Sequence, residues 1–221
     1  MTQRALTLRK RMQRNKAEIS MTAIIDYDAG NIKSVEKAVS FLGHEAVVTR
    51  DEEVIMNSDR VILPGVGSFG DAMGRLKSYG LDKVLCKYAE SGKPFLGICL
   101  GLQLLFEDSE ESPGVEGLGI LKGHVLRIPK KDGLTVPQIG WNDLSIRPGT
   151  KLFEGVKNGA FVYFVHSYYL SCEEADAVAA TTEYGVTVHA AVEKGNVFAC
   201  QFHPEKSSDV GLKILDNFLK V

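Results

Sequence analysis

The chain has 221 residues, of which 44% are hydrophobic, and it carries four cysteines and a formal net charge of −2. This length accommodates one large domain or two small ones with a well-buried core. Residues 1–20 hold six basic side chains and one Glu, so the rest of the chain is clearly acidic, which argues against nucleic acid as the main partner.

Residues 1–20 form a basic head that ends where Met21 opens an apolar strand pattern. The head lacks the long apolar segment and the small-residue cleavage site of a secretory signal. We interpret it as a disordered extension, an expression remnant or a misplaced start, with a functional basic arm as the alternative. No run of about 20 apolar residues predicts a membrane span.

Residues 21–106 alternate between strand and helix patterns. Strands are predicted at 22–27, 45–50 and 93–98, with a further strand running into a glycine-rich loop over 59–70. Helices are predicted at 31–43, 51–58, 71–92 (with a break near Gly80) and 100–106. This alternation is typical of a parallel sheet with helices on both faces.

After residue 112 the pattern changes to that of antiparallel strands. Period-two stretches fill residues 119–146, where the Lys-Lys-Asp-Gly sequence at 130–133 predicts a hairpin turn. Further strands are predicted at 160–170, 177–184, 186–196 and 197–202, and an amphipathic helix at 207–221. We therefore expect one mixed α/β domain over residues 21–221.

Cys99 lies between Gly97 and Gly101 at a predicted strand-to-helix corner. The pattern matches a nucleophile elbow in which Cys replaces Ser, because the two glycines allow a sharp turn and close packing. The unpaired N–H groups of the following helix would favour a thiolate. The alternative is an ordinary buried cysteine.

A nucleophilic thiol needs a base and a group that orients the base. His203 and Glu205, in the stretch "QFHPEKS", can supply both, because an i, i+2 spacing in an extended segment points two side chains to the same side. One alternative is a loop histidine beside a solvated glutamate. The other is a metal pair of Cys200 and His203, which lacks a second pair with ligand spacing.

Acyl transfer also needs donors for a tetrahedral oxyanion. The loop "LPGVGSFG" at 63–70 exposes backbone amides after a predicted strand. The amides around Val66 and Gly67, with that of Leu100, are the candidate oxyanion hole. A phosphate-binding loop is the alternative, but the Walker pattern and its lysine are absent.

Taken in order, "PGVGSFG", "GICLGLQLLFE" and "QFHPEKS" resemble the class I, triad-type glutamine amidotransferases over about residues 22–221. The stretches "DYDAGNIKSV", "IGWNDL", "YFVHSYY" and "HPEKSS" narrow the resemblance to the family of glutaminase subunits of imidazole glycerol phosphate synthase. The resemblance implies a flavodoxin-like, mostly parallel sheet flanked by helices, with an antiparallel extension. It also places the active site at the carboxyl ends of the strands.

The same resemblance implies a role for each matching residue. The implied catalytic triad is Cys99, His203 and Glu205, the implied glutamine-binding residues are Gln103, Glu111, His166 and Ser167, and the implied partner face contains Asn31, Trp141 and Lys206. A carboxylate such as that of Glu111 suits the ammonium group of glutamine. The alternatives are a solvated acidic face at Glu111, and a core tryptophan with a solvated lysine in place of a partner face.

The resemblance further implies the reaction and the partner. L-glutamine is hydrolysed through a Cys thioester, and ammonia passes to a separate (β/α)₈-barrel cyclase subunit that makes imidazole glycerol phosphate and a purine precursor. This chemistry requires no metal or organic cofactor, and neither nucleic acid nor a membrane is expected as a partner. Four cysteines without a CxxC pair indicate a reducing compartment, and we expect a bacterial or archaeal cytoplasm.

Three other functions remain open from the sequence. A paralogous glutaminase could feed a different synthase, such as one that amidates surface sugars. A cysteine peptidase of related fold would form its thioester with a peptide. A binding subunit that has lost catalysis is disfavoured by the complete set of Cys99, His203 and Glu205.

Overall fold

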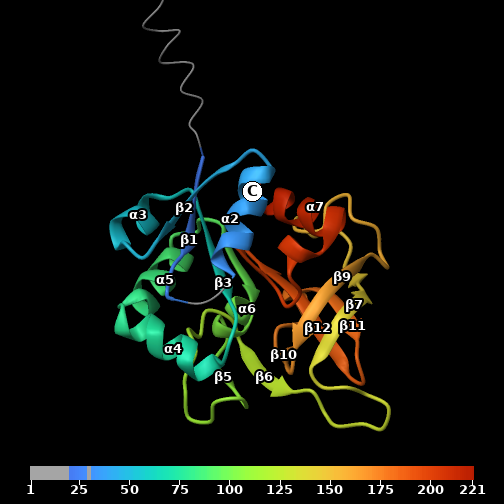
Figure 1. Ribbon diagram of the computed structural model, residues 1–221. Coiled ribbons are helices and arrows are strands. Elements are labelled where there is room, and N and C mark those ends of the chain that lie inside the picture. Colours follow the sequence, from blue (N-terminus) through green and yellow to red (C-terminus); the bar gives the residue numbers. More distant parts are fainter. Residues whose placement is uncertain (1–19, 29–30) are drawn as a thin grey trace, which may run out of the picture.

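The computed structural model describes residues 20–28 and 31–221, so the predicted extension at 1–20 lies, apart from Ser20, outside the described residues. Figure 1 shows a central twisted sheet with helices on both sides and smaller strands below and to the right of it. None of the helices in the described ranges combines the length and the apolar composition that a bilayer crossing needs.

The main sheet has eight strands in the order β2-β1-β3-β4-β13-β12-β11-β8. Its first five strands are parallel and the last three are antiparallel additions. This order confirms the predicted flavodoxin-like sheet and its antiparallel extension. The strands are β2 (Glu45–Thr49), β1 (Met21–Ile25), β3 (Arg60–Gly65), β4 (Phe95–Cys99), β13 (Val197–Cys200), β12 (Thr187–Lys194), β11 (Val178–Glu183) and β8 (Ser145–Ile146).

Helices cover the two faces of this sheet and bury two separate apolar clusters. On one face lie α2 (Ile32–Phe41) and α7 (Ser208–Leu219); on the other lie α3 (Glu52–Asn57), α4 (Phe69–Ser78) and α5 (Leu81–Glu90). The predicted break is confirmed at Gly80, which joins α4 to α5 with a φ of 69°. That left-handed conformation suits a residue without a Cβ.

Two smaller sheets lie beside the main one, and they correct one prediction. β6 (Gly123–Arg127) pairs with β5 (Asp108–Ser109) and β10 (Tyr168–Cys172), whereas β7 (Gln138–Asp143) pairs with β9 (Phe161–His166). The predicted hairpin at 130–133 is therefore wrong. The two small sheets contribute to different cores. Val125 of β6 is buried with the α4–α5 cluster, whereas Phe164 of β9 is buried with the α2–α7 cluster.

The corner after β4 is closely packed. Cys99 has φ 56° and ψ −110°, and α6 (Leu100–Leu104) begins directly after it. A Cβ on Gly101 would lie 1.9 Å from the carbonyl oxygen of Leu63, and one on Gly97 would lie 2.7 Å from that of Gly101. The glycines are required because three backbone segments meet here, and the structure holds Cys99 in a conformation that costs free energy.

We expect Gly101→Ala to lower the free energy of unfolding by about 3 kcal/mol or more, because its Cβ meets backbone that cannot yield. Gly74→Ala, within α4, is the matched control, since no atom lies within 4 Å of its Cβ position. It should stabilise the protein by about 0.5–1 kcal/mol. Urea unfolding of both variants measures the difference, and equal effects would contradict the close packing.

Candidate active site

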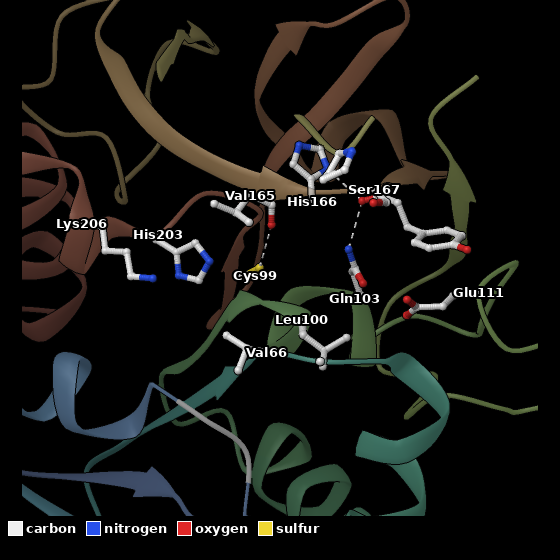
Figure 2. A pocket seen from close by; sticks show the side chains of 13 residues that line it. Val66, Cys99, Leu100, Gln103, Glu111, Val165, His166, Ser167, His203 and Lys206 are labelled. Carbon is white, nitrogen blue, oxygen red and sulfur yellow. Dashed lines mark hydrogen bonds between the residues drawn. The ribbon is translucent and has the colours of Figure 1, made fainter. Parts of the chain in front are cut away.

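A cavity of about 330 Å³ opens at the carboxyl ends of the parallel strands, and Figure 2 shows the side chains that line it. The ends of β3, β4 and β13 each contribute to its wall, as the sequence predicts for a site on such a sheet. Its lining consists of Val66, Gly67, Cys99, Leu100, Gln103, Glu111, Pro137, Val165, His166, Ser167, Tyr168, His203 and Lys206.

The Cys99 side chain lies at the centre of this cavity and is 7% exposed. Its Sγ donates to the backbone oxygen of Val165, on β9, over 3.9 Å. It also accepts from Nε2 of Gln201, which follows β13, over 3.7 Å. The elbow therefore holds the sulfur at a fixed point between the main sheet and the β7–β9 pair.

His203 and Glu205 form a buried pair beside the thiol. Nδ1 of His203 lies 2.9 Å from Oε1 of Glu205, and the two side chains are 4% and 0% exposed. Burial alone would lower the pKa of His203, but its interactions with nearby Cys99 and with Glu205 raise that pKa to about 9. Because Nδ1 faces the carboxylate, Nε2 is left for the cavity.

The local conformation that brings this pair together differs from the expected one. His203 is extended, but Glu205 lies in a 3₁₀ turn, η2 (Pro204–Lys206), rather than in an extended segment. Oε1 of Glu205 also accepts a hydrogen bond from the side-chain amide of Asn31, at the start of α2. Asn31, predicted to face a partner, is thus connected to the same carboxylate as His203.

The two glycines at the end of β3 and in the following loop, Gly65 and Gly67, differ in how closely other atoms surround them. A Cβ on Gly65 would lie 2.5 Å from the hydroxyl of Tyr27 and 2.9 Å from the Cβ of Leu100, so this backbone is wedged against the elbow. Gly67 has φ 104° and open space at its Cβ position. Gly67 thus has a backbone conformation that glycine adopts readily, while Leu100 begins α6 directly after the nucleophile.

Two of the remaining predicted residues, Gln103 and His166, share the backbone carbonyl of Tyr168. The oxygen of Tyr168 accepts from Nε2 of Gln103 over 3.1 Å and lies 2.8 Å from Nδ1 of His166. Glu111 lies near Gln103, and its Oε2 accepts a hydrogen bond from the backbone N–H of Phe69 over 2.7 Å. Figure 2 shows Gln103 and Glu111 on the same side of the cavity.

His166 is held neutral by its surroundings. Burial lowers its pKa to about 4, with a smaller contribution from nearby His203. Its Nδ1 therefore carries the proton and donates to the backbone oxygen of Tyr168. Nε2 lies 3.0 Å from Oε1 of Gln138, and the neutral ring accepts a hydrogen bond there when that amide turns its NH₂ group toward the ring. Gln138, on β7, was not anticipated from the sequence.

The predicted partner residues lie in two places. Lys206 is exposed and lines the cavity directly beside Glu205. Trp141, on the outer face of β7, is 51% exposed and packs edge-on against Tyr163 with ring centroids 6.0 Å apart. The alternative of a core tryptophan is therefore wrong, since this ring lies on the surface.

The alternative metal pair of Cys200 and His203 is not supported by the structure. Cys200 is fully buried, and its Sγ donates to the backbone oxygen of Phe202 over 3.5 Å, so it does not face outward with His203. Burial also raises the pKa of Cys200. Glu107, His124 and Glu173 bring potential ligand atoms within 4.8 Å of one another, but they lie on the surface outside the cavity lining.

Comparisons with known proteins agree with one another. The family model "Glutamine amidotransferase class-I" matches residues 23–221. The chain is 52% identical to "Imidazole glycerol phosphate synthase subunit HisH" of Caldanaerobacter subterraneus over 90% of this chain and 97% of that protein. It is 47% identical to the protein of the same name in Methanocaldococcus jannaschii, over 91% and 100%.

The solved structures that resemble this chain extend the comparison of folds. A "Crystal structure of glutamine amidotransferase" superposes with a TM-score of 0.70 at 24% identity, covering 90% of this chain and 97% of that one. The "Structure of PurLQS from Thermotoga maritima" gives a TM-score of 0.71 at 23% identity, with the same coverage. At these identities the likeness concerns the fold.

Because His166 is neutral in the folded protein, we expect the free energy of unfolding to fall as the pH is lowered. Its pKa of about 4 lies below the value of about 6.5 in an unfolded chain, so below pH 6.5 the unfolded state binds a proton that the folded state does not. The free energy of unfolding should fall by about 3 kcal/mol between pH 6.5 and pH 4 from this group. In His166→Gln, this part of the pH dependence of the free energy of unfolding should be absent.

The measurement is urea unfolding of both proteins at a series of pH values. Burial also lowers the pKa of His189, but this residue is present in both proteins and its effect cancels in the difference. A difference between the two proteins that stays constant from pH 7 to pH 4 would contradict a neutral His166.

Proposed function

The chain belongs to the class I glutamine amidotransferase family and, within it, to the HisH subunits of imidazole glycerol phosphate synthase; from this premise we propose that it hydrolyses L-glutamine to glutamate and ammonia for histidine biosynthesis. The observation that carries the proposal is the meeting of Cys99, the His203–Glu205 pair and Leu100 around one cavity. We take Cys99, His203 and Glu205 as the catalytic triad.

In the proposed reaction, the thiol proton of Cys99 passes to Nε2 of His203, and the resulting thiolate attacks the side-chain carboxamide carbon of glutamine. The C–N bond then breaks, and His203 returns the proton to the departing ammonia. Water, deprotonated by His203, hydrolyses the resulting thioester and expels the thiolate. Glu205 stabilises the imidazolium in both halves of the reaction, and its buried carboxylate makes this interaction strong.

We assign stabilisation of the tetrahedral oxygen to the amides of Val66, Gly67 and Leu100. The fixed start of α6 supplies the Leu100 amide directly beside the nucleophile. Gly67, whose φ of 104° suits a residue without a Cβ, is assigned a peptide that turns toward the oxygen once substrate is present. The Leu100 amide is already positioned, so it costs no reorganisation when charge develops.

The other end of glutamine fits the polar groups across the cavity. Both N–H groups of the Gln103 amide are used within the protein, so Oε1 remains as an acceptor. Together with the carboxylate of Glu111, it suits the substrate ammonium group. We assign the wall formed by His166 and Ser167 to the same end of the substrate, where neutral His166 avoids a second positive charge.

We further propose that ammonia passes to a separate (β/α)₈-barrel cyclase subunit, forming imidazole glycerol phosphate and a purine precursor. Ammonia released into neutral water becomes ammonium and loses its nucleophilicity, so the two subunits must enclose its path. The proposed contact is the outer face of the β7–β9 pair, defined here as Ile139, Trp141 and Phe161, with Asn31 and Lys206 beside the cavity. The first three side chains are 63%, 51% and 56% exposed.

This function requires no cofactor and suits a cytoplasmic protein. The four cysteines are free thiols, as in a reducing compartment. A paralogous glutaminase for another synthase, a cysteine peptidase and a catalytically inactive subunit are not favoured, because relatives at about half identity over nine tenths of the chain share one name.

Replacing the nucleophile tests the proposed chemistry. Cys99→Ser should reduce glutamate formation in the presence of the synthase by a factor of about 10⁴ or more, because a serine hydroxyl is far less acidic than a thiol. Affinity for the synthase should remain, since the side chains have similar size. A glutamine-analogue alkylator should label Cys99 and spare Cys86, Cys172 and Cys200, as mapped by peptide mass spectrometry. Labelling of another cysteine instead would refute the assignment.

Trp141→Ala tests the proposed partner face. It should weaken binding of the cyclase by about tenfold or more, because a large exposed aromatic side chain at an interface centre commonly contributes this much. Phe41→Ala is the matched control: Phe41 is 77% exposed but lies at the far end of α2 from Asn31. Titration calorimetry with purified cyclase measures both, and equal affinities for the two variants would exclude Trp141 from the interface.

A further inference from the structure

We propose that Gln201 is a further catalytic residue of this site: its side-chain amide donates a hydrogen bond to Sγ of Cys99 and stabilises the thiolate. The inference rests on the proposed function only in taking Cys99 as the nucleophile. Nε2 of Gln201 lies 3.7 Å from Sγ, within the range for a hydrogen bond to sulfur. The side chain is completely buried.

The orientation of the Gln201 amide is set by the backbone carbonyl of Tyr168, which acts through the side chain of Gln103. The oxygen of Tyr168 can only accept, so the side-chain amide of Gln103 must turn its NH₂ group toward it. The same NH₂ group reaches Oε1 of Gln201 over 3.0 Å. Gln201 is therefore committed to present its oxygen to Gln103 and its NH₂ group to the sulfur.

The backbone of Gln201 is also fixed. Its N–H donates to the oxygen of Ala190, on β12, over 2.8 Å, directly after β13 ends. Two residues later the chain supplies His203, so one short segment delivers both the base and the amide to the same sulfur. A buried donor that cannot rotate away costs no ordering when the thiolate forms.

The amide complements the role of His203. An imidazole exchanges its proton during the reaction, whereas an amide stays a donor at every step and every accessible pH. The sulfur carries negative charge twice: before it attacks the carboxamide, and again when water expels it from the thioester. A donor aimed at the sulfur therefore assists both halves of the reaction, because hydrogen bonds to charged groups are the stronger ones.

The arrangement also connects substrate recognition with the nucleophile. Gln103 lines the glutamine end of the cavity, and its amide holds Gln201 in the donating orientation. A substrate group that binds Oε1 of Gln103 fixes the same amide further. Occupancy of the amino-acid end is thereby transmitted to the thiol through two side chains.

Two replacements of Gln201 test the inference. Gln201→Met has similar length and removes the amide. Gln201→Glu keeps an acceptor for Gln103 but places a carboxylate oxygen, instead of a donor, against the sulfur. The probe is iodoacetamide, and the readout is the pH at which alkylation of Cys99 is half-maximal, measured on the full chain by peptide mass spectrometry.

We expect the midpoint to rise by about one pH unit in Gln201→Met, with about tenfold slower alkylation at pH 7, and to rise further in Gln201→Glu. Asn217→Leu is the matched control, because it removes another buried amide, one that donates to the oxygens of Leu152 and Glu154 beneath α7. Its midpoint should match that of the unmodified protein.

A second readout separates a role in chemistry from a role in binding. In the complex with synthase, Gln201→Met should lower kcat at saturating glutamine by about tenfold or more, beyond any change in KM. An unshifted midpoint in a folded Gln201→Met or Gln201→Glu protein would overturn the inference. So would a shift of the same size in Asn217→Leu.

The alkylation measurement does not need glutamine turnover. If the unmodified protein did not hydrolyse glutamine, the proposed function would fail while the effect of Gln201 on the thiol would still be decided. If Gln201→Met did not fold, Gln201→Glu would decide it, since that side chain has nearly the same size and retains the contact with Gln103.

Discussion

The close approach of three backbone segments at the Cys99 corner is the constraint on which the site depends. β3, β4 and the start of α6 touch where Gly65, Gly97 and Gly101 leave no side chain between them. Because these contacts are between main-chain atoms, they leave little freedom to the residue at the turn. Cys99 consequently remains in a conformation that an isolated chain avoids, and its thiol is raised into the cavity.

Around this fixed sulfur, two hydrogen-bond networks position the functional side chains. The carbonyl of Tyr168 orients both His166 and Gln103, and Gln103 in turn orients Gln201. On the opposite side, the side chains of Asn31 and His203 share Oε1 of Glu205. These hydrogen bonds are formed within the protein, so the side chains are positioned before any substrate arrives.

The segment that follows β1 is secured by charge at Asp26 and Asp28. Arg50 donates to carboxylates of Asp26 and Asp28 over 2.8 Å each, and its guanidinium lies over the ring of Tyr79, 4.3 Å from the centroid. The hydroxyl of Tyr79 and the Arg50 guanidinium lower the pKa of Asp28. These contacts connect the segment after β1 to the ends of β2 and α4.

Much of this protein was determined by local sequence alone. The alternation of strand and helix, the break at Gly80 and the sharp corner at Cys99 follow from patterns within a dozen residues, because hydrophobic period and glycine placement act locally. The proximity of His203 to Glu205 was also correctly expected, although a 3₁₀ turn rather than an extended segment produces it. The family motifs identified the same residues independently.

The tertiary structure alone decided which distant segments meet. β6 and β7 lie in different sheets: Val125 of β6 is buried in one core, whereas β7 pairs with β9, whose Phe164 is buried in the other. The contacts of Gln201 with Cys99, and of Asn31 with Glu205, join residues 102 and 174 positions apart. No periodicity in the sequence encodes such pairs, since they arise from the packing of whole elements, and so the donor to the thiol became visible only in the folded chain.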